Sequence, residues 1–140
     1  MNTPDVDRSW PRRNAWIVLV ILGGLQAASG LAILINPVDW ARFERSTGIA
    51  RSPDLAVWVE GQARLCGGMA FGVGLFAAAL AWTQVRRQDL AGWRLMWIFP
   101  GVLALMTIVF AISGALPQAG AYGALTVVAI GGLLLARPSQ

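Results

Sequence analysis

Glu60 and Arg64 are the charged residues whose spacing best suits chemistry within an otherwise apolar part of this chain. They lie four positions apart with the acid first, so on a helix they share a face and can form an ion pair. Either charge alone is costly in an apolar region, whereas a pair is tolerated. Two interpretations stay open. The pair contacts an ion, a proton or a quinone headgroup at the mouth of a cavity, or it is a structural pair that fixes the depth of the helix.

Other kinds of chemistry lack their residues. The chain has no histidine, which removes the usual general base and the commonest metal and haem ligand. Cys66 is the single cysteine, so no disulfide can form within the chain, and we expect this thiol to be a small packing residue. No group of acids and cysteines has metal-ligand spacing. We therefore predict no catalytic residues, no metal site and no cofactor.

Long apolar segments must position the polar pair, because 56% of the 140 residues are hydrophobic and only 13% are charged. Each segment holds about 20 residues, which is the length of helix that crosses a hydrocarbon core of about 30 Å. The sequence predicts an all-α integral membrane protein, a four-helix transmembrane bundle formed by a single domain over residues 1–140. The predicted spans are residues 15–35, 60–83, 94–116 and 118–136, with an interfacial segment over residues 37–52.

The basic residues, which are all arginines, predict the orientation of these spans. The side that receives both termini holds Arg8, Arg12, Arg13, Arg86, Arg87, Arg94 and Arg137. The other side holds the smaller set Arg42, Arg45, Arg51 and Arg64. By the positive-inside rule both termini are cytoplasmic. Arginine use without lysine, together with abundant alanine and glycine, is typical of a GC-rich bacterial genome, so we predict a multi-pass protein of the bacterial inner membrane.

Tryptophans mark the same two boundaries, since indole rings favour the depth of the lipid headgroups. The predicted inner anchors are Trp10, Trp16, Trp82, Trp93 and Trp97, and the outer anchors are Trp40 and Trp58. Trp40 and Phe43 lie three residues apart, which predicts a short amphipathic helix lying in the interface. A plain loop with two stray aromatic residues is the alternative.

Small residues recur at four-residue spacing in the spans and would let helix backbones approach closely. Gln26 lies in the middle of the first span, where its amide has no water and should face another helix or, alternatively, a ligand. The predicted packing positions are Gly24, Gln26, Ala28, Gly30, Gly67, Gly68, Gly72 and Gly74. These stripes explain packing within the chain, and they also permit a homo-oligomer.

Two local signals predict where helices start and bend. Ser52-Pro53-Asp54 supplies an N-cap oxygen, a proline in the first turn and a favourable negative charge, so a helix should begin at Pro53. Pro100-Gly101 interrupts the third span, and proline removes one backbone hydrogen bond, so a kink is expected there.

Residues 15–80 carry a resemblance to a known group of membrane proteins. The residues concerned are Leu34-Ile35-Asn36-Pro37, Gly48-Ile49 and the run from Glu60 to Phe76, which reads EGQARLCGGMAFGVGLF. This pattern resembles the small four-helix bacterial membrane proteins of the DoxX-like type, which include relatives of unknown function. The resemblance implies a four-helix bundle. DoxX itself is associated with quinone-linked thiosulfate oxidation, and this chain lacks the cysteine pair and ligands for such redox work.

Three classes of function remain open on the sequence alone. The first is an accessory or assembly subunit of a larger membrane complex. The second is a lipid- or quinone-binding membrane protein with Glu60 and Arg64 at the level of the headgroups. The third is a small transporter or an enzyme subunit. In each class the expected partners are the lipid bilayer, other membrane subunits or a second copy. Nucleic acid is not expected, because membrane topology explains the excess of arginine.

Overall fold

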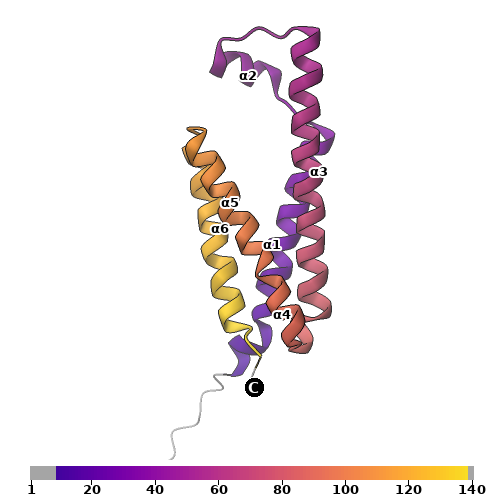
Figure 1. Cartoon of the computed structure of the whole chain (residues 1–140), viewed down its shortest axis with the longest axis vertical. Coiled ribbons are helices and arrows are strands. Elements are labelled where there is room, and N and C mark those ends of the chain that lie inside the picture. The colour runs from indigo at the N-terminus through magenta and orange to yellow at the C-terminus, as the bar shows by residue number, and fades with distance from the viewer. Residues whose placement is uncertain (1–8, 139–140) are drawn as a thin grey trace, which may run out of the picture. The chain divides into compact units, whose positions relative to one another are not determined.

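The computed structural model describes residues 9–138, with side chains from Asn14 onward. The predictions for Arg8, Trp10, Arg12 and Arg13 fall outside the described residues or side chains. All regular structure in the described part is helical (Figure 1). The elements are α1 (Ser9–Ile35), α2 (Trp40–Thr47), α3 (Pro53–Thr83), the 3-10 turn η1 (Val85–Arg87), α4 (Leu90–Met96), α5 (Ile98–Ile112) and α6 (Leu116–Leu135).

Four stretches of this part are long and apolar enough to cross a membrane: Asn14–Ile35, Pro53–Arg87, Leu90–Ile112 and Leu116–Leu135. This confirms the all-α class and the four apolar spans, as in a multi-pass membrane protein. Two compact units are formed, one by Met1–Leu22 with Phe76–Gln140 and the other by Gly23–Leu75. Helices α1 and α3 each contribute residues to both units.

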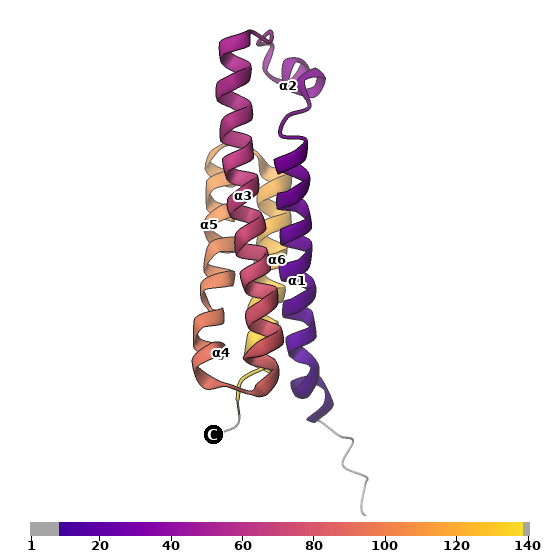
Figure 2. The same ribbon diagram turned by 90° about the vertical axis from the view of Figure 1, so that its right-hand side faces the viewer.

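Within the Gly23–Leu75 unit, α1 and α3 pack through glycines at very close range (Figure 2). A Cβ atom added to Gly67 would lie 2.9 Å from both the carbonyl oxygen of Gly30 and the backbone nitrogen of Leu34. A Cβ added to Gly74 would lie 2.6 Å from the carbonyl oxygen of Gly23. Neither position therefore accepts a side chain without moving a backbone, as expected for helices held by dispersion at short distance.

Not all the predicted packing positions take part in this contact. A Cβ added to Gly24 or Gly72 would meet nothing within 4 Å, and Ala28 is exposed. A Cβ on Gly68 would reach only the side chain of Leu34, at 3.5 Å. The prediction that Gly24, Ala28 and Gly72 pack within the chain is therefore corrected. The residues share the four-residue spacing of the others but lie on a different side of their helices.

The connection between α1 and α3 contains a capped helix, so the helical alternative for this segment is the one observed. Asp39 caps α2 by accepting a hydrogen bond from the backbone nitrogen of Arg42 at 3.1 Å. Gly48 ends the helix with a φ of 71°, a left-handed conformation that suits glycine. Helix α3 begins at Pro53 as predicted, and Ser52 Oγ accepts from the backbone nitrogen of Leu55 at 3.3 Å.

In the other unit, α5 and α6 form an antiparallel hairpin joined by three residues (Figure 1). Gly114 has a φ of 76°, and its nitrogen donates to the carbonyl of Ala111 at 3.2 Å. The nitrogen of Ala115 donates to the carbonyl of Phe110 at 2.9 Å, which completes a Schellman motif. The rings of Phe110 and Tyr122 stack with centroids 5.3 Å apart across the hairpin.

The predicted interruption of the third span separates α4 from α5. Pro100 lacks a backbone N–H and its ring crowds the carbonyl of Met96, four residues earlier, where α4 ends. The nitrogen of Gly101 makes a long contact of 3.4 Å with the carbonyl of Trp97. The break is therefore a local consequence of one proline.

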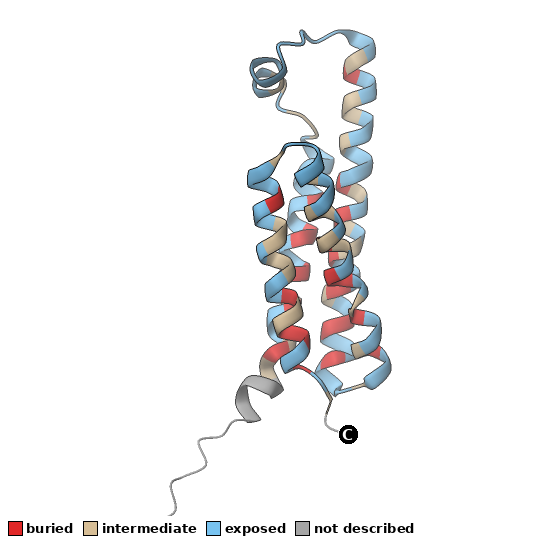
Figure 3. Cartoon of the chain, turned by 60° about the vertical axis from the view of Figure 1, so that its left-hand side comes forward, coloured by how far each residue is buried: buried red, intermediate tan, exposed pale blue. Residues whose placement is uncertain are grey.

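Buried residues occupy only part of each long helix, and exposed residues occupy much of the rest (Figure 3). The largest side chains less than 2% exposed all belong to one unit: Leu19, Val85, Met96, Leu103 and Leu133. Other large apolar side chains, in both units, are exposed, including Val57 at 77%, Val127 at 70% and Ile112 at 82%. Lipid tails solvate such side chains at no hydrophobic cost, so this surface suits a bilayer.

Candidate functional site

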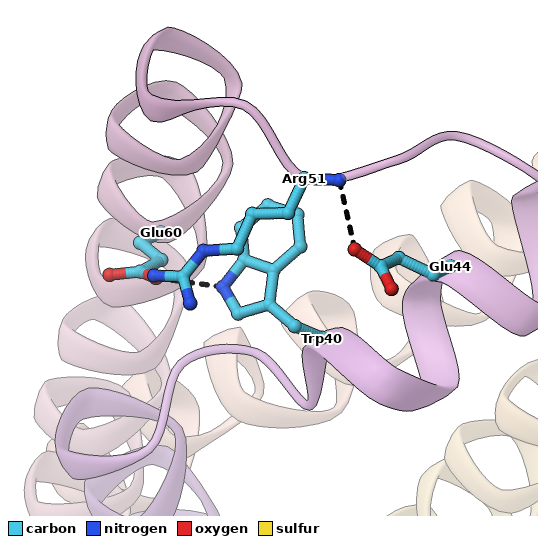
Figure 4. A network of polar contacts seen from close by, with 4 residues as sticks. All are labelled: Trp40, Glu44, Arg51 and Glu60. Carbon is cyan, nitrogen blue, oxygen red and sulfur yellow. Dashed lines mark hydrogen bonds and ion pairs between the residues drawn. The ribbon is translucent and has the colours of Figure 1, made fainter.

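The candidate site is a polar network that joins α2 to α3 in the Gly23–Leu75 unit (Figure 4). Trp40 Nε1 donates a 2.8 Å hydrogen bond to Oε1 of Glu60. A guanidinium nitrogen of Arg51 lies 3.4 Å from the same oxygen, which forms an ion pair. The Arg51 guanidinium carbon also lies 5.1 Å from the centre of the Trp40 ring, within cation–π range. Two side chains from distant positions, Trp40 and Arg51, thus converge on one carboxylate.

A second carboxylate fixes the loop that carries Arg51. The backbone nitrogen of Arg51 donates to Oε1 of Glu44 at 2.9 Å, and Figure 4 shows this contact beside the first. The Trp40 and Phe43 rings meet edge to face with centroids 5.2 Å apart. Arg51 is consequently held through both its backbone and its side chain, although it lies just before α3.

The indole hydrogen bond contributes more to this network than the ion pair. Side-chain exposures of 55% for Arg51 and 28% for Glu60 place the ion pair largely in contact with solvent. Exposed pairs are worth about 0–1 kcal/mol, and the contact is long. A hydrogen bond to a charged acceptor is worth about 1.5–3 kcal/mol. The geometry therefore indicates that Trp40, more than Arg51, attaches α2 to α3.

The ion-pair partner of Glu60 differs from the one predicted. The carboxylate pairs with Arg51, whereas Arg64 is exposed and makes no ion pair with any described residue. Arg51 precedes Glu60 by nine positions and lies before the start of α3, so no helical spacing could reveal the pair. Trp40 was predicted as a membrane anchor in a short amphipathic helix, not as a partner of Glu60. Nothing in the sequence singled out Glu44 as the acceptor for Arg51.

An open hollow adjoins the network. It measures about 510 Å³ and is lined by Arg51, Ser52, Pro53, Ala56, Val57 and Glu60. Oε1 of Glu60 takes both contacts described above, and Oε2 accepts no hydrogen bond from the residues that the structure describes. The hollow thus has a carboxylate and a guanidinium in its lining, and these groups can form hydrogen bonds with a polar headgroup.

The remaining predicted anchors lie in varied surroundings. Trp58 is 66% exposed on α3. The rings of Trp16 and Trp82 meet edge to face with centroids 5.3 Å apart, and Arg86 lies against both rings.

Trp93 Nε1 donates a hydrogen bond of 2.8 Å to the carbonyl of Leu133, near the end of α6. Trp97 meets Trp93 edge to face at 6.0 Å. Trp93 therefore also satisfies a terminal carbonyl that α6 leaves free.

Gln26 is buried, with 5% of its surface exposed, as its place in the first span predicts. No hydrogen bond of its side-chain amide to a described residue accompanies this burial, so the choice between helix contact and ligand contact stays open. Cys66 is exposed. From residue 9 to residue 138, no three acidic or cysteine side chains come together in a group that could hold a metal ion.

The chain was compared with protein-family models, curated proteins and solved structures, and none of them matches.

Proposed function

We propose that this chain is an accessory or assembly subunit of a larger membrane complex, residing in the bacterial inner membrane with both termini in the cytoplasm. The support for a docking role comes from α3, which has two glycine-bearing faces. One face, with Gly67 and Gly74, is filled by α1. The other bears Gly61 and Gly72, where an added Cβ would meet nothing within 4 Å.

The open face is the single observation that carries this proposal. Gly61 and Gly72 are eleven residues apart, which on an α-helix brings them within about 20° of each other around the axis. Leu65 lies on the same face and is 59% exposed. Glycine inside a helix costs about 0.5–1 kcal/mol relative to alanine. Close contact with α1 offsets this cost at Gly67, and a partner helix would offset it at Gly61 and Gly72.

Native mass spectrometry after gentle solubilisation tests the docking role. The wild-type chain should carry a companion protein at fixed stoichiometry, and Gly72→Leu should lose it without lowering the thermal midpoint. Ala111→Leu is the matched control, because it adds the same kind of bulk at an exposed position on α5. A wild-type chain that stays without a companion, or equal loss from both variants, would contradict the proposal.

Binding of a lipid or quinone headgroup beside Glu60 is a second candidate function. The hollow of about 510 Å³ next to this carboxylate favours it, with Arg51 and Ser52 on the rim. A chain purified without partners should then release an extractable lipid or quinone in organic solvent. Glu60→Gln should reduce the amount recovered, whereas Glu44→Gln should not. Equal recovery from both variants would argue against this function.

A further inference from the structure

Arg86 lies against two indole rings in the unit formed by Met1–Leu22 and Phe76–Gln140. Its guanidinium carbon is 4.8 Å from the centre of the Trp82 ring and 5.3 Å from that of Trp16. The two rings meet at an interplanar angle of 78°. Trp16 comes from α1 and Trp82 from the end of α3, so residues far apart in sequence hold one cation.

The backbone that carries Arg86 is firmly placed. Val85 is completely buried, and the nitrogen of Gln88 donates to its carbonyl at 3.0 Å. Gln88 closes η1 with a φ of 59°, and the nitrogen of Arg87 donates to the carbonyl of Gln84 at 3.0 Å. A Cβ on Gly92 would collide with the side chain of Gln84, so α4 lies directly against this turn.

Within the described part of the chain, no ion pair neutralises the positive charge of this cluster. Neither Arg86 nor Arg87 forms an ion pair with a residue that the structure describes. The nearest acid in sequence, Asp89, uses its carboxylate to cap α4 by accepting from the nitrogen of Gly92 at 2.8 Å. An open hollow of about 360 Å³ lies here, lined by Trp82, Thr83, Arg86 and Arg87.

We propose that Trp16, Trp82, Arg86 and Arg87 form a binding site for a phosphate-bearing group, which the headgroup of an anionic phospholipid would supply in a membrane. A guanidinium that lies against aromatic rings keeps its N–H edge available, and this edge matches two phosphate oxygens. Indole rings favour headgroup depth, so the aromatic part of the site lies where lipid phosphates lie. An arginine that served topology alone would need its charge but not this fixed position.

Lipid adducts of the purified full-length chain test the site. Affinity would be measured by native mass spectrometry for phosphatidylglycerol and for phosphatidylcholine of the same acyl chains. The wild type should prefer phosphatidylglycerol, and Arg86→Gln should lower that affinity about tenfold or more, as expected for lost charge-assisted hydrogen bonds. Arg94→Gln is the matched control, because it removes one exposed arginine of the same unit outside the hollow. Arg94 attracts anionic lipid only through its charge near the membrane surface. Arg94→Gln should therefore lower the affinity for phosphatidylglycerol by no more than about fivefold.

A titration with soluble inorganic phosphate distinguishes the two possible sources of the phosphate group. Titration of the detergent-solubilised chain with inorganic phosphate, at constant ionic strength, should give no binding if the lipid headgroup is the ligand. Binding of inorganic phosphate that Arg86→Gln abolishes would assign the same site to a free phosphate. Equal losses in Arg86→Gln and Arg94→Gln, or equal wild-type affinity for the two lipids with no phosphate binding, would overturn the proposal.

The folding of each variant is checked by the near-ultraviolet circular dichroism of its indoles. Should Arg86→Gln fail to fold, Arg87→Gln carries the same comparison, because Arg87 is exposed and lines the hollow. Its loss should again exceed that of Arg94→Gln, and equal losses would overturn the proposal.

Discussion

The indole nitrogen of Trp40 lies 2.8 Å from the carboxylate of Glu60, twenty residues further along the chain. This hydrogen bond joins the first residue of α2 to the second turn of α3. The intervening loop is tied by the hydrogen bond that the backbone nitrogen of Arg51 donates to the carboxylate of Glu44. A short helix that buries no residue of its own is thereby attached to the long one.

Removing the indole donor should release α2. Trp40→Phe keeps an aromatic ring but loses the N–H, so we expect a loss of about 1.5–3 kcal/mol of local stability. Hydrogen exchange of the α2 amides should accelerate accordingly. Trp58→Phe is the control, since Trp58 is 66% exposed, and its α2 exchange should match the wild type. Unchanged exchange in Trp40→Phe would show that this hydrogen bond does not hold α2.

Glu60 offers a way to separate the hydrogen bond from the ion pair. Glu60→Gln keeps an acceptor oxygen for Trp40 but loses the charge. It should remove the ion pair, worth about 0–1 kcal/mol, and weaken the hydrogen bond from about 1.5–3 kcal/mol to about 0.5–1.5 kcal/mol. Glu60→Ala removes both interactions and should cost distinctly more. Thermal unfolding in one detergent would compare the two variants. Equal losses would mean that the charge, rather than the indole contact, dominates.

The two glycine faces of α3 should respond to alanine in opposite directions. Gly67→Ala forces a methyl group against the backbones of Gly30 and Leu34, and overpacking of this kind costs about 1–3 kcal/mol. Gly72→Ala meets open space and should stabilise the isolated chain by about 0.5–1 kcal/mol through helix propensity. Thermal midpoints of the purified chain measure both effects. A shift of the same sign in the two variants would contradict the assignment of the faces.

Trp93 should stabilise the end of α6. Trp93→Phe removes the donor to the carbonyl of Leu133, at a cost of about 0.5–1.5 kcal/mol. Exchange of amides in the last turns of α6 should accelerate, while those near Tyr122 should not. Trp97→Phe is the control, because the Trp97 side chain makes a ring contact with Trp93 but no hydrogen bond to a residue that the structure describes. Equal exchange in the two variants would show that the hydrogen bond from Trp93 does not stabilise the end of α6.

Much of the fold follows from short-range signals in the sequence. Apolar length predicts the spans, Ser52 and Pro53 predict the start of α3, and Pro100 predicts the break before α5. Each of these depends on neighbours within one or two helical turns, where backbone hydrogen bonding and sterics decide the outcome. The helical form of α2 likewise follows from the spacing of Trp40 and Phe43.

The candidate site could be predicted only in part, because its contacts depend on how the chain turns back. Glu60 was found by its type and position, but its partners Trp40 and Arg51 reach it across a loop. Spacing alone also cannot distinguish Gly67 from Gly72, since both belong to four-residue patterns on one helix. Only the location of α1 shows which of the two is covered.

The Schellman turn at Gly114 has a consequence for biogenesis. No charged residue occurs between Arg94 and Arg137, so the α5–α6 hairpin and its tip contain no formal charge. The two helices can therefore enter the bilayer together, tip first, without carrying an ionised group through hydrocarbon. Insertion of the C-terminal half then requires no separate translocation of a polar loop.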